Sequence, residues 1–279
     1  MNGRICVVTG ATHGVGLSTA RALAALGATV VLHGRDLERA RALAEDIGRS
    51  TGNREVRAVQ ADFAELAQVR RLAQELDNLP RLDVLINNAG MMSAARERSA
   101  EGYDLTLAVN HLAPFLLTNL LLGKLKGSAP SRVIVVASEA HRRASLDFAD
   151  LMNTSVSGLL PAYARSKLAN VLFARALAAR LAGSGVTVNA LHPGLVYSNL
   201  FHRSAVLRLL LGTLLRPFML SSEQGARTSV YLATAPELAG QSGGYYRDCR
   251  LVAPSAAAQN DADASRLWQE SARLTGLVA

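Results

Sequence analysis

Residues 162–167 carry a phenol and an ammonium group four residues apart, on Tyr163 and Lys167. Residues at i and i+4 share one face of an α-helix. A phenol near its ordinary pKa of about 10 releases a proton poorly at neutral pH, and a neighbouring ammonium stabilises the phenolate. The pair therefore predicts a proton donor beside its electrostatic activator. By itself this spacing also fits the solvated face of an Ala-rich helix, so the interpretation depends on other motifs.

A glycine-rich turn near the amino terminus predicts a second site. An apolar strand pattern at 5–9 runs directly into this turn, and a helical pattern follows it. Glycines let the backbone approach a diphosphate closely, and the free N–H groups at a helix start face its charge. The spacing differs from the usual Gly-x-Gly-x-x-Gly, and a tight turn without a ligand is the alternative. The residues expected to bind are Gly10, Thr12, His13, Gly14, Val15 and Gly16.

The elements that must position these groups follow a strand and helix alternation. Apolar runs predict seven strands, at 5–9, 29–32, 55–60, 84–87, 133–137, 186–191 and 244–246, and helical patterns fill the intervals. Strands separated by helices need crossover connections, so we expect a single-domain α/β fold of the Rossmann type. This is a doubly wound, mainly parallel sheet with helices on both faces. Five motifs each follow a predicted strand and should share the rim where such sheets bind ligands: the glycine turn, Asp62, Asn87-Asn88-Ala89-Gly90, Ser138 and Pro193-Gly194.

Together the motifs resemble the short-chain dehydrogenase/reductase family. The resemblance rests on Thr9-Gly10-x-x-x-Gly14-x-Gly16, Asn87-Asn88-Ala89-Gly90, Asn110, Ser138 and Tyr163-x-x-x-Lys167, in that order. Segments 33–36, 110–118, 166–170 and 191–194 are similar to the retinol dehydrogenase-like branch of that family. The resemblance implies hydride exchange between a nicotinamide and an alcohol or carbonyl carbon, with proton transfer by Tyr163.

The same resemblance assigns roles to further residues. It implies that Ser138 hydrogen-bonds the substrate oxygen, that Lys167 also holds the nicotinamide ribose, and that Asn110 anchors a water linking Lys167 to solvent. Without the resemblance, Ser138 is a strand-end hydroxyl and Asn110 a helix-interior amide. The spacing of Asp62 fits a helix cap, the resemblance implies a contact with the adenine, and both roles can hold together. The other expected cofactor contacts are Asn88, Ala89, Gly90, Pro193, Gly194 and Val196.

The end of the second predicted strand indicates which nicotinamide cofactor binds. An acidic side chain there would bind the adenosine ribose and repel an added phosphate, whereas this chain has Gly34 followed by Arg35. A planar, permanently charged guanidinium suits a 2′-phosphate, and His13 is a second candidate contact. Asp36 is interpreted as a helix cap. We therefore predict NADP(H) over NAD(H).

Composition and charge limit the function classes. A chain of 279 residues with 49% hydrophobic residues fits one domain, and its net charge of +8 comes from arginines at helical intervals. We therefore expect solvated helix faces and no nucleic-acid partner. The two cysteines and six histidines lack metal-ligand spacing, so no metal is expected. His141 is interpreted as an exposed loop histidine, and a place in the lining of the substrate mouth is the alternative. The first strand leaves no room for a secretory signal, and no apolar run could span a bilayer, so we expect a cytoplasmic protein.

Residues 196–222 are predicted to form an apolar lid over the site, because Phe201 and 206–220 supply Leu, Phe and Met side chains. Such a lid fits a small lipophilic alcohol, aldehyde or ketone. Alternatively, 205–220 packs in an oligomer, against the core or on a membrane surface. A homodimer or homotetramer is expected from the resemblance alone. Two other functions stay open, namely a noncatalytic NADP(H)-sensing interaction protein and a sugar-nucleotide epimerase or dehydratase.

Overall fold

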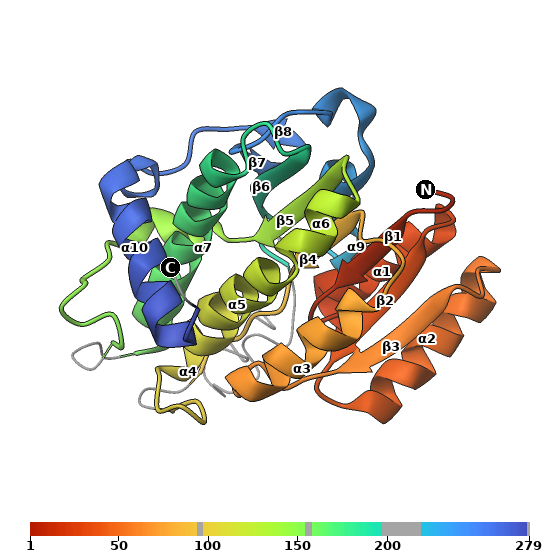
Figure 1. Cartoon of the computed structure of the whole chain (residues 1–279), viewed down its shortest axis with the longest axis horizontal. Helices are drawn as coiled ribbons and strands as arrows, with labels where there is room; N and C mark the ends of the chain where they lie inside the picture. Colours follow the sequence, from red (N-terminus) through yellow and green to blue (C-terminus); the bar gives the residue numbers. More distant parts are fainter. Residues whose placement is uncertain (94–96, 154–157, 197–218, 278–279) are drawn as a thin grey trace.

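The computed structural model describes residues 1–93, 97–153, 158–196 and 219–277 of the chain. These residues form one eight-stranded sheet with the strand order β3-β2-β1-β4-β5-β6-β7-β8 and helices on both faces (Figure 1). All neighbouring pairs are parallel except β7 and β8. This arrangement confirms the predicted α/β fold of the Rossmann type. The strands are β1 (Ile5–Val8), β2 (Thr29–Gly34), β3 (Val56–Gln60), β4 (Val84–Asn87), β5 (Ser131–Val136), β6 (Val186–His192), β7 (Tyr245–Arg247) and β8 (Arg250–Leu251).

The prediction of seven strands is wrong by one. Strand β8 has only two residues, both exposed, so it lacks the apolar run and the alternation that indicate a strand in a sequence. It is joined to β7 by Asp248 and Cys249, whose φ angles are positive, at 51° and 59°. Two consecutive residues of this conformation form the tight turn that connects antiparallel strands. The sheet therefore ends in a short hairpin.

The helices divide between the two faces because successive strand residues point to opposite sides of the sheet. One hydrophobic core contains Val7 and Leu85 and includes residues of α3, α5, α7 and α10. The other contains Cys6 and Ile86 and includes residues of α1, α2 and α9. The helices are α1 (Gly14–Ala25), α2 (Leu37–Thr51), α3 (Leu66–Asp77), α4 (Leu105–Leu107), π-helix η1 (Ala108–Leu112), α5 (Ala113–Leu120), α6 (Leu122–Gly127), 3₁₀-helix η2 (Glu139–Arg143), α7 (Leu159–Arg180), α9 (Ser222–Thr234), 3₁₀-helices η5 (Pro236–Leu238) and η6 (Ala257–Gln259), and α10 (Asp261–Thr275).

Two aspartates near helix starts behave differently. Asp36 caps α2, as the sequence predicts, because its side chain accepts a hydrogen bond from the Arg39 N–H at 3.0 Å. The capping role considered for Asp62 is wrong. Helix α3 begins only at Leu66, and Asp62 accepts a hydrogen bond from the Ala64 N–H at 2.9 Å in the preceding turn.

Two features are absent from the described part of the chain. No helix there combines the length and the apolar composition that crossing a membrane would require. No group of three or more His, Cys, Asp or Glu side chains among the described residues could hold a metal ion.

Candidate active site

The glycine turn and the segment after β4 are joined at the carboxyl edge of the sheet. The Asn88 side-chain amide donates to the carbonyl oxygens of Thr9 at 2.8 Å and Gly10 at 3.2 Å, and the Ala89 N–H donates to Thr9 Oγ1 at 3.0 Å. A Cβ atom added to Gly16 would lie 2.3 Å from Asn88 Nδ2, so no larger residue fits there without displacement. Asn88 thus braces the turn.

Helix α1 starts in this turn without a side-chain cap. His13 precedes its first residue in an extended conformation, and its side chain makes no capping hydrogen bond. The first N–H groups of a helix have no acceptor within the helix and carry a partial positive charge. The residues of this turn therefore fit an anionic group such as the diphosphate of a dinucleotide.

A buried histidine that the sequence did not single out supports the same turn. His33 Nδ1 accepts a hydrogen bond from the Gly10 N–H at 3.2 Å, so the ring proton is on Nε2, which donates to the Ala61 carbonyl oxygen at 3.0 Å. The ring stacks on Phe63 with centroids 4.4 Å apart. Burial lowers the pKa of His33 to about 4, so the ring is neutral at physiological pH. The one signal in the sequence is a polar ring at the end of an apolar strand.

Positive charge gathers beside the glycine turn at the end of β2. Arg35 and Arg39 are exposed. Burial is the main cause that lowers the pKa of His13, and the charges of Arg39 and Arg35 lower it further. A Cβ atom on Gly34 would lie 2.4 Å from Thr12 Cγ2, so a side chain at the position expected to be acidic in an NAD-binding chain would require the Thr12 side chain to move. Arg39 was missed by the sequence reasoning because it lies a helical turn beyond the strand end.

Tyr163 and Lys167 lie on one face of α7, as predicted. Lys167 Nζ is 5.5 Å from the centroid of the Tyr163 ring and donates a hydrogen bond to the Val136 carbonyl oxygen at 2.9 Å. Burial lowers the pKa of Lys167 to about 8. Burial also raises the pKa of Tyr163 to about 12, against a hydrogen bond with the Ser138 side chain that lowers it. The expected lowering of the phenol pKa is therefore wrong for this structure, because desolvation outweighs the stabilising contacts.

Asn110 lies in the π-helix η1 and is fully buried. Its Oδ1 accepts from the Met91 N–H at 2.8 Å, while its Nδ2 donates to the Met91 carbonyl oxygen and to Ser166 Oγ, both at 2.9 Å. Ser166 Oγ donates in turn to the Tyr163 carbonyl oxygen at 2.7 Å. A Cβ atom on Gly90 would lie 3.3 Å from Lys167 Nζ and 3.5 Å from Asn110 Oδ1. Gly90 after β4, Asn110 of η1 and Lys167 of α7 therefore lie next to one another.

The segment after β6 lies against the start of α1. A Cβ atom added to Gly225 of α9 would lie 2.4 Å from Val196, 3.0 Å from Val15 and 3.3 Å from the Pro193 carbonyl oxygen. Gly194 has a positive φ of 87°. The predicted cofactor contacts from these two segments are therefore neighbours around α9. Most of the predicted lid, residues 197–218, lies outside the described residues.

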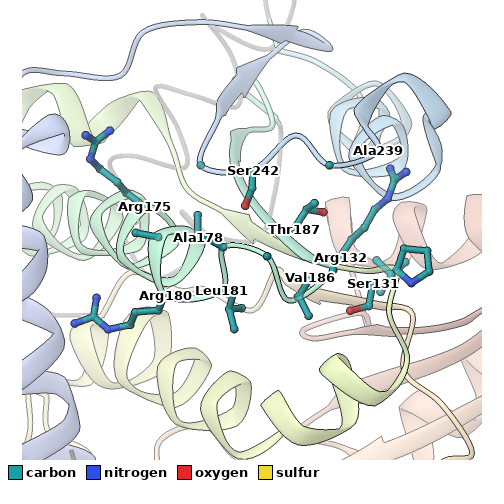
Figure 2. A pocket seen from close by; sticks show the side chains of 18 of the residues that line it. Ser131, Arg132, Arg175, Ala178, Arg180, Leu181, Val186, Thr187, Ala239 and Ser242 are labelled. Carbon is teal, nitrogen blue, oxygen red and sulfur yellow. The ribbon is translucent and has the colours of Figure 1, made fainter.

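A large cavity lies at the opposite edge of the sheet (Figure 2). Its volume is about 1150 Å³, and its lining includes Ser131 and Val186, the first residues of β5 and β6. Its arginines have partners within the protein: Arg132, for example, donates to the Leu232 and Ala235 carbonyl oxygens at 2.8 Å and so caps the end of α9. None of the residues assigned to the reaction or the cofactor lines this cavity.

Comparison with known proteins decides the family. A sequence model described as short chain dehydrogenase matches residues 4–205. The chain belongs to the short-chain dehydrogenase family. The family consists of oxidoreductases, and the chain's likeness to its members extends over almost its whole length.

Three members illustrate this likeness. Dehydrogenase/reductase SDR family member 13 of Bos taurus is 49% identical over 99% of this chain and 74% of its own length. Retinol dehydrogenase 13 of Homo sapiens is 44% identical over 99% of this chain and 86% of its own. The crystal structure of a short chain dehydrogenase of Shigella flexneri complexed with NADP has a TM-score of 0.72 and 25% identity, and it covers 90% of this chain and 98% of that one. The predicted resemblance to the retinol dehydrogenase-like branch is confirmed.

Proposed function

We propose that this protein is an NADP(H)-dependent oxidoreductase that reduces a lipophilic aldehyde or ketone to the alcohol. The observation that carries the proposal is the meeting of Tyr163, Ser138 and Lys167 beside an uncapped helix start at the carboxyl edge of the sheet. A nicotinamide bound by the residues of the glycine turn would supply the hydride for the carbonyl carbon. The chain supplies the proton, from the Tyr163 hydroxyl to the carbonyl oxygen.

Each residue of the site has a task in this scheme. The Ser138 hydroxyl hydrogen-bonds the carbonyl oxygen and orients it toward Tyr163. The Lys167 ammonium stabilises the phenolate that Tyr163 leaves, and holds the nicotinamide ribose. The Asn110 side chain, through Met91 and Ser166, keeps the loop after β4 in register with α7. The glycine turn holds the diphosphate.

The preference for NADP(H) is supported by the charges at the end of β2. Arg35 and Arg39 have no ion-pair partner among the described residues, and His13 lies close enough to feel both charges. A 2′-phosphate would supply the missing negative charge, which favours the phosphorylated cofactor. The structural relative complexed with NADP agrees with this preference.

A lipophilic substrate is supported by apolar side chains on the segments that carry the site. Leu160 lies three residues before Tyr163 and Leu195 follows Gly194, and these leucines are 56% and 47% exposed. Relatives named retinol dehydrogenase are consistent with an apolar substrate. The lid at 196–222 belongs to this proposal, whereas a cytoplasmic location and a homodimer or homotetramer stay predictions from the sequence.

Net consumption of NADPH tests the proposal. The purified protein is incubated with NADPH and a panel of apolar aldehydes and ketones, including retinal, and the loss of NADPH is followed. We expect stoichiometric alcohol formation with at least one compound. A protein that binds NADPH without turnover would be the noncatalytic sensor, and one that recycles a bound cofactor on a sugar nucleotide would be the epimerase or dehydratase.

A further inference from the structure

A fully buried histidine contacts the backbone of Ser138. His141 Nδ1 lies 2.7 Å from the Ser138 carbonyl oxygen, and its Nε2 accepts a hydrogen bond from the Ser255 N–H at 3.1 Å. A backbone N–H can only donate, so Nε2 carries no proton and the ring proton is on Nδ1. The Nδ1–H therefore donates to the Ser138 carbonyl oxygen. The expectation of an exposed loop histidine at this position is wrong, because the segment around Ser255 covers the ring.

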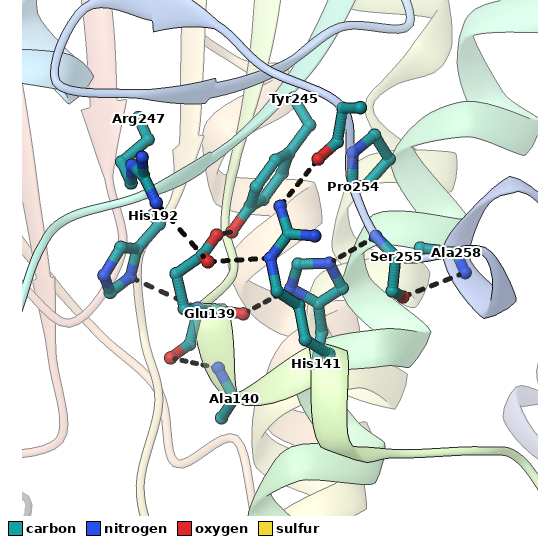
Figure 3. A network of polar contacts seen from close by, with 12 residues as sticks. Glu139, Ala140, His141, His192, Tyr245, Arg247, Pro254, Ser255 and Ala258 are labelled. Carbon is teal, nitrogen blue, oxygen red and sulfur yellow. Dashed lines mark hydrogen bonds and ion pairs between the residues drawn. The ribbon is translucent and has the colours of Figure 1, made fainter.

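The turn that contains His141 is held from three further directions (Figure 3). Glu139 accepts a hydrogen bond from the Tyr245 hydroxyl of β7 at 3.0 Å, and its N–H donates to His192 Nδ1 of β6 at 3.3 Å. Arg142 donates to Glu139 at 2.7 Å and to the Ala253 carbonyl oxygen at 2.6 Å. Tyr245 also packs edge-on against the His141 ring, with centroids 4.9 Å apart. The histidine ring thus cannot turn without breaking packed contacts.

These contacts determine where the serine hydroxyl lies. The Ser138 carbonyl oxygen accepts from both the backbone N–H of His141, at 3.1 Å, and its imidazole. The Ser138 side chain accepts from the Ala140 N–H at 3.2 Å, and its interaction with the Tyr163 hydroxyl is the cause that lowers the pKa of that phenol against burial. The carbonyl and the hydroxyl belong to one residue in an extended conformation. Loss of the imidazole contact would therefore free the Ser138 backbone and, with it, the hydroxyl.

We propose that His141 is a positioning residue for the reaction, whose Nδ1–H holds the Ser138 backbone so that the Ser138 hydroxyl stays beside the Tyr163 phenol. The anchor of the ring is the C-terminal segment, through the Ser255 N–H. His141 and Ser255, which lie 114 positions apart in the sequence, thereby both help to hold the Ser138 hydroxyl in place. This inference rests on the proposed function, because it assigns Ser138 to the reaction.

Two substitutions of His141 separate positioning from folding. In His141→Asn, the amide nitrogen replaces Nδ1 and keeps the donor for Ser138. In His141→Gln, the longer amide replaces Nε2 and loses that donor. Both variants remove the ring. We expect His141→Gln to lower kcat about 10²-fold, the cost of a misplaced reacting group, with NADPH affinity unchanged. His141→Asn should keep most of kcat.

A stability control and a double-mutant cycle complete the test. Leu267→Ala in α10 removes a buried core side chain that is none of the residues assigned to the reaction or the cofactor, and it should lower Tm without lowering kcat. In a Ser138→Ala background, His141→Gln should cause no further loss of kcat, since His141 acts only through Ser138. Equal losses in His141→Asn and His141→Gln, or full additivity with Ser138→Ala, would overturn the proposal.

Crystal structures of both His141 variants give a readout that needs no substrate. We expect the Ser138 hydroxyl to leave Tyr163 in His141→Gln and to stay in His141→Asn. An unmoved hydroxyl in His141→Gln would contradict the positioning role whatever the activity. If the wild-type protein reduces no carbonyl compound while these displacements occur as described, the proposed function fails and the positioning of Ser138 stands.

Discussion

Burial decides the protonation of the two central groups of the site. Tyr163 keeps its proton because desolvation raises its pKa to about 12, which suits a residue that gives a proton to a carbonyl oxygen. Lys167 has its pKa lowered to about 8 by the same cause, so its charge is retained only on the acidic side of that value. Carbonyl reduction therefore needs Tyr163 with its proton, whereas alcohol oxidation needs Tyr163 without it.

Replacement of Tyr163 by Phe tests the proton donor. Tyr163→Phe removes only the hydroxyl, so we expect kcat for carbonyl reduction to fall about 10²–10⁴-fold, the usual contribution of positioned acid catalysis. The dissociation constant for NADPH, measured by fluorescence titration, should stay close to wild type. Retention of full turnover by this variant would remove Tyr163 from the mechanism.

The pH dependence of reduction tests Lys167. Its lowered pKa means that the ammonium loses its proton as the pH rises through about 8. We therefore expect kcat for reduction to decline through that range, because the neutral amine no longer stabilises the Tyr163 phenolate. Lys167→Ala should be slow at every pH and should lack this decline. A wild-type profile that is flat up to pH 10, the order of an unperturbed lysine, would contradict the assignment.

Exposed arginines test the choice of cofactor. Arg35→Ala and Arg39→Ala should each weaken NADPH binding while leaving NADH binding nearly unchanged, because each removes a charge offered to the 2′-phosphate. Arg41→Ala is the matched control, since Arg41 lies on the same helix but pairs with Glu38 at 3.1 Å. The ratio of the two dissociation constants is the measurement, and an unchanged ratio in both variants would refute the phosphate site.

At the scale of the elements, the first βα connection is defined by close approach. At Gly16, α1 lies against the segment after β4, since a Cβ atom there would lie 2.3 Å from Asn88 Nδ2 and 2.5 Å from the Gly10 carbonyl oxygen. Backbone atoms and a braced amide cannot yield as a flexible side chain would. The site and the fold therefore depend on the same glycine.

Two glycine substitutions separate this contact from helix propensity. Gly16→Ala should lower the free energy of unfolding by roughly 1–3 kcal/mol, the cost of overpacking a core, and should abolish NADPH binding. Gly123→Ala in α6 has open space around the added Cβ atom, so it should stabilise the protein by roughly 0.5–1 kcal/mol. Urea unfolding measures both. Similar stabilities of the two variants would show that the turn tolerates a methyl group.

Elements that rest on local patterns were predictable from the sequence, and elements that rest on distant contacts were not. The strands β1 to β7 and the rim that they share follow from apolar runs and from the need for crossover connections. Strand β8 was not predicted because its position depends on the turn at Asp248 and Cys249 and not on an apolar run of its own. The roles of His33 and His141 were not predicted because a buried, neutral histidine and an exposed one cannot be distinguished in a sequence. Their partners, Ala61 and Ser255, lie 28 and 114 residues away.

Across the whole molecule, burial leaves the described histidines neutral. His13, His33, His111, His141 and His192 all have pKa values lowered mainly by desolvation, and for His33 and His111 the pKa is about 4. The unfolded chain takes up protons below about pH 6.5, whereas the folded chain does not. Folding is therefore coupled to pH through several histidines at once.

The free energy of unfolding should consequently fall as the pH drops from about 6.5 to about 4. In that window the unfolded state binds more protons, so stability is fully present above it and is lost toward its acidic end. His33 and His111 each contribute on the order of 3 kcal/mol. Urea unfolding at several pH values should give a slope that His111→Gln reduces. A raised pKa of Asp104 acts in the opposite direction and moderates the fall.

The contact between Gly34 and Thr12 constrains how this enzyme's coenzyme selectivity could be re-engineered. Introducing a carboxylate at position 34 alone would push its first carbon to 2.4 Å from the threonine methyl. If the proposed preference for NADP(H) holds, we expect an acidic residue at position 34 to favour the unphosphorylated dinucleotide more strongly when Thr12 is shortened at the same time. Laboratory evolution that starts from this sequence should therefore find such variants more often when position 12 is free to vary as well.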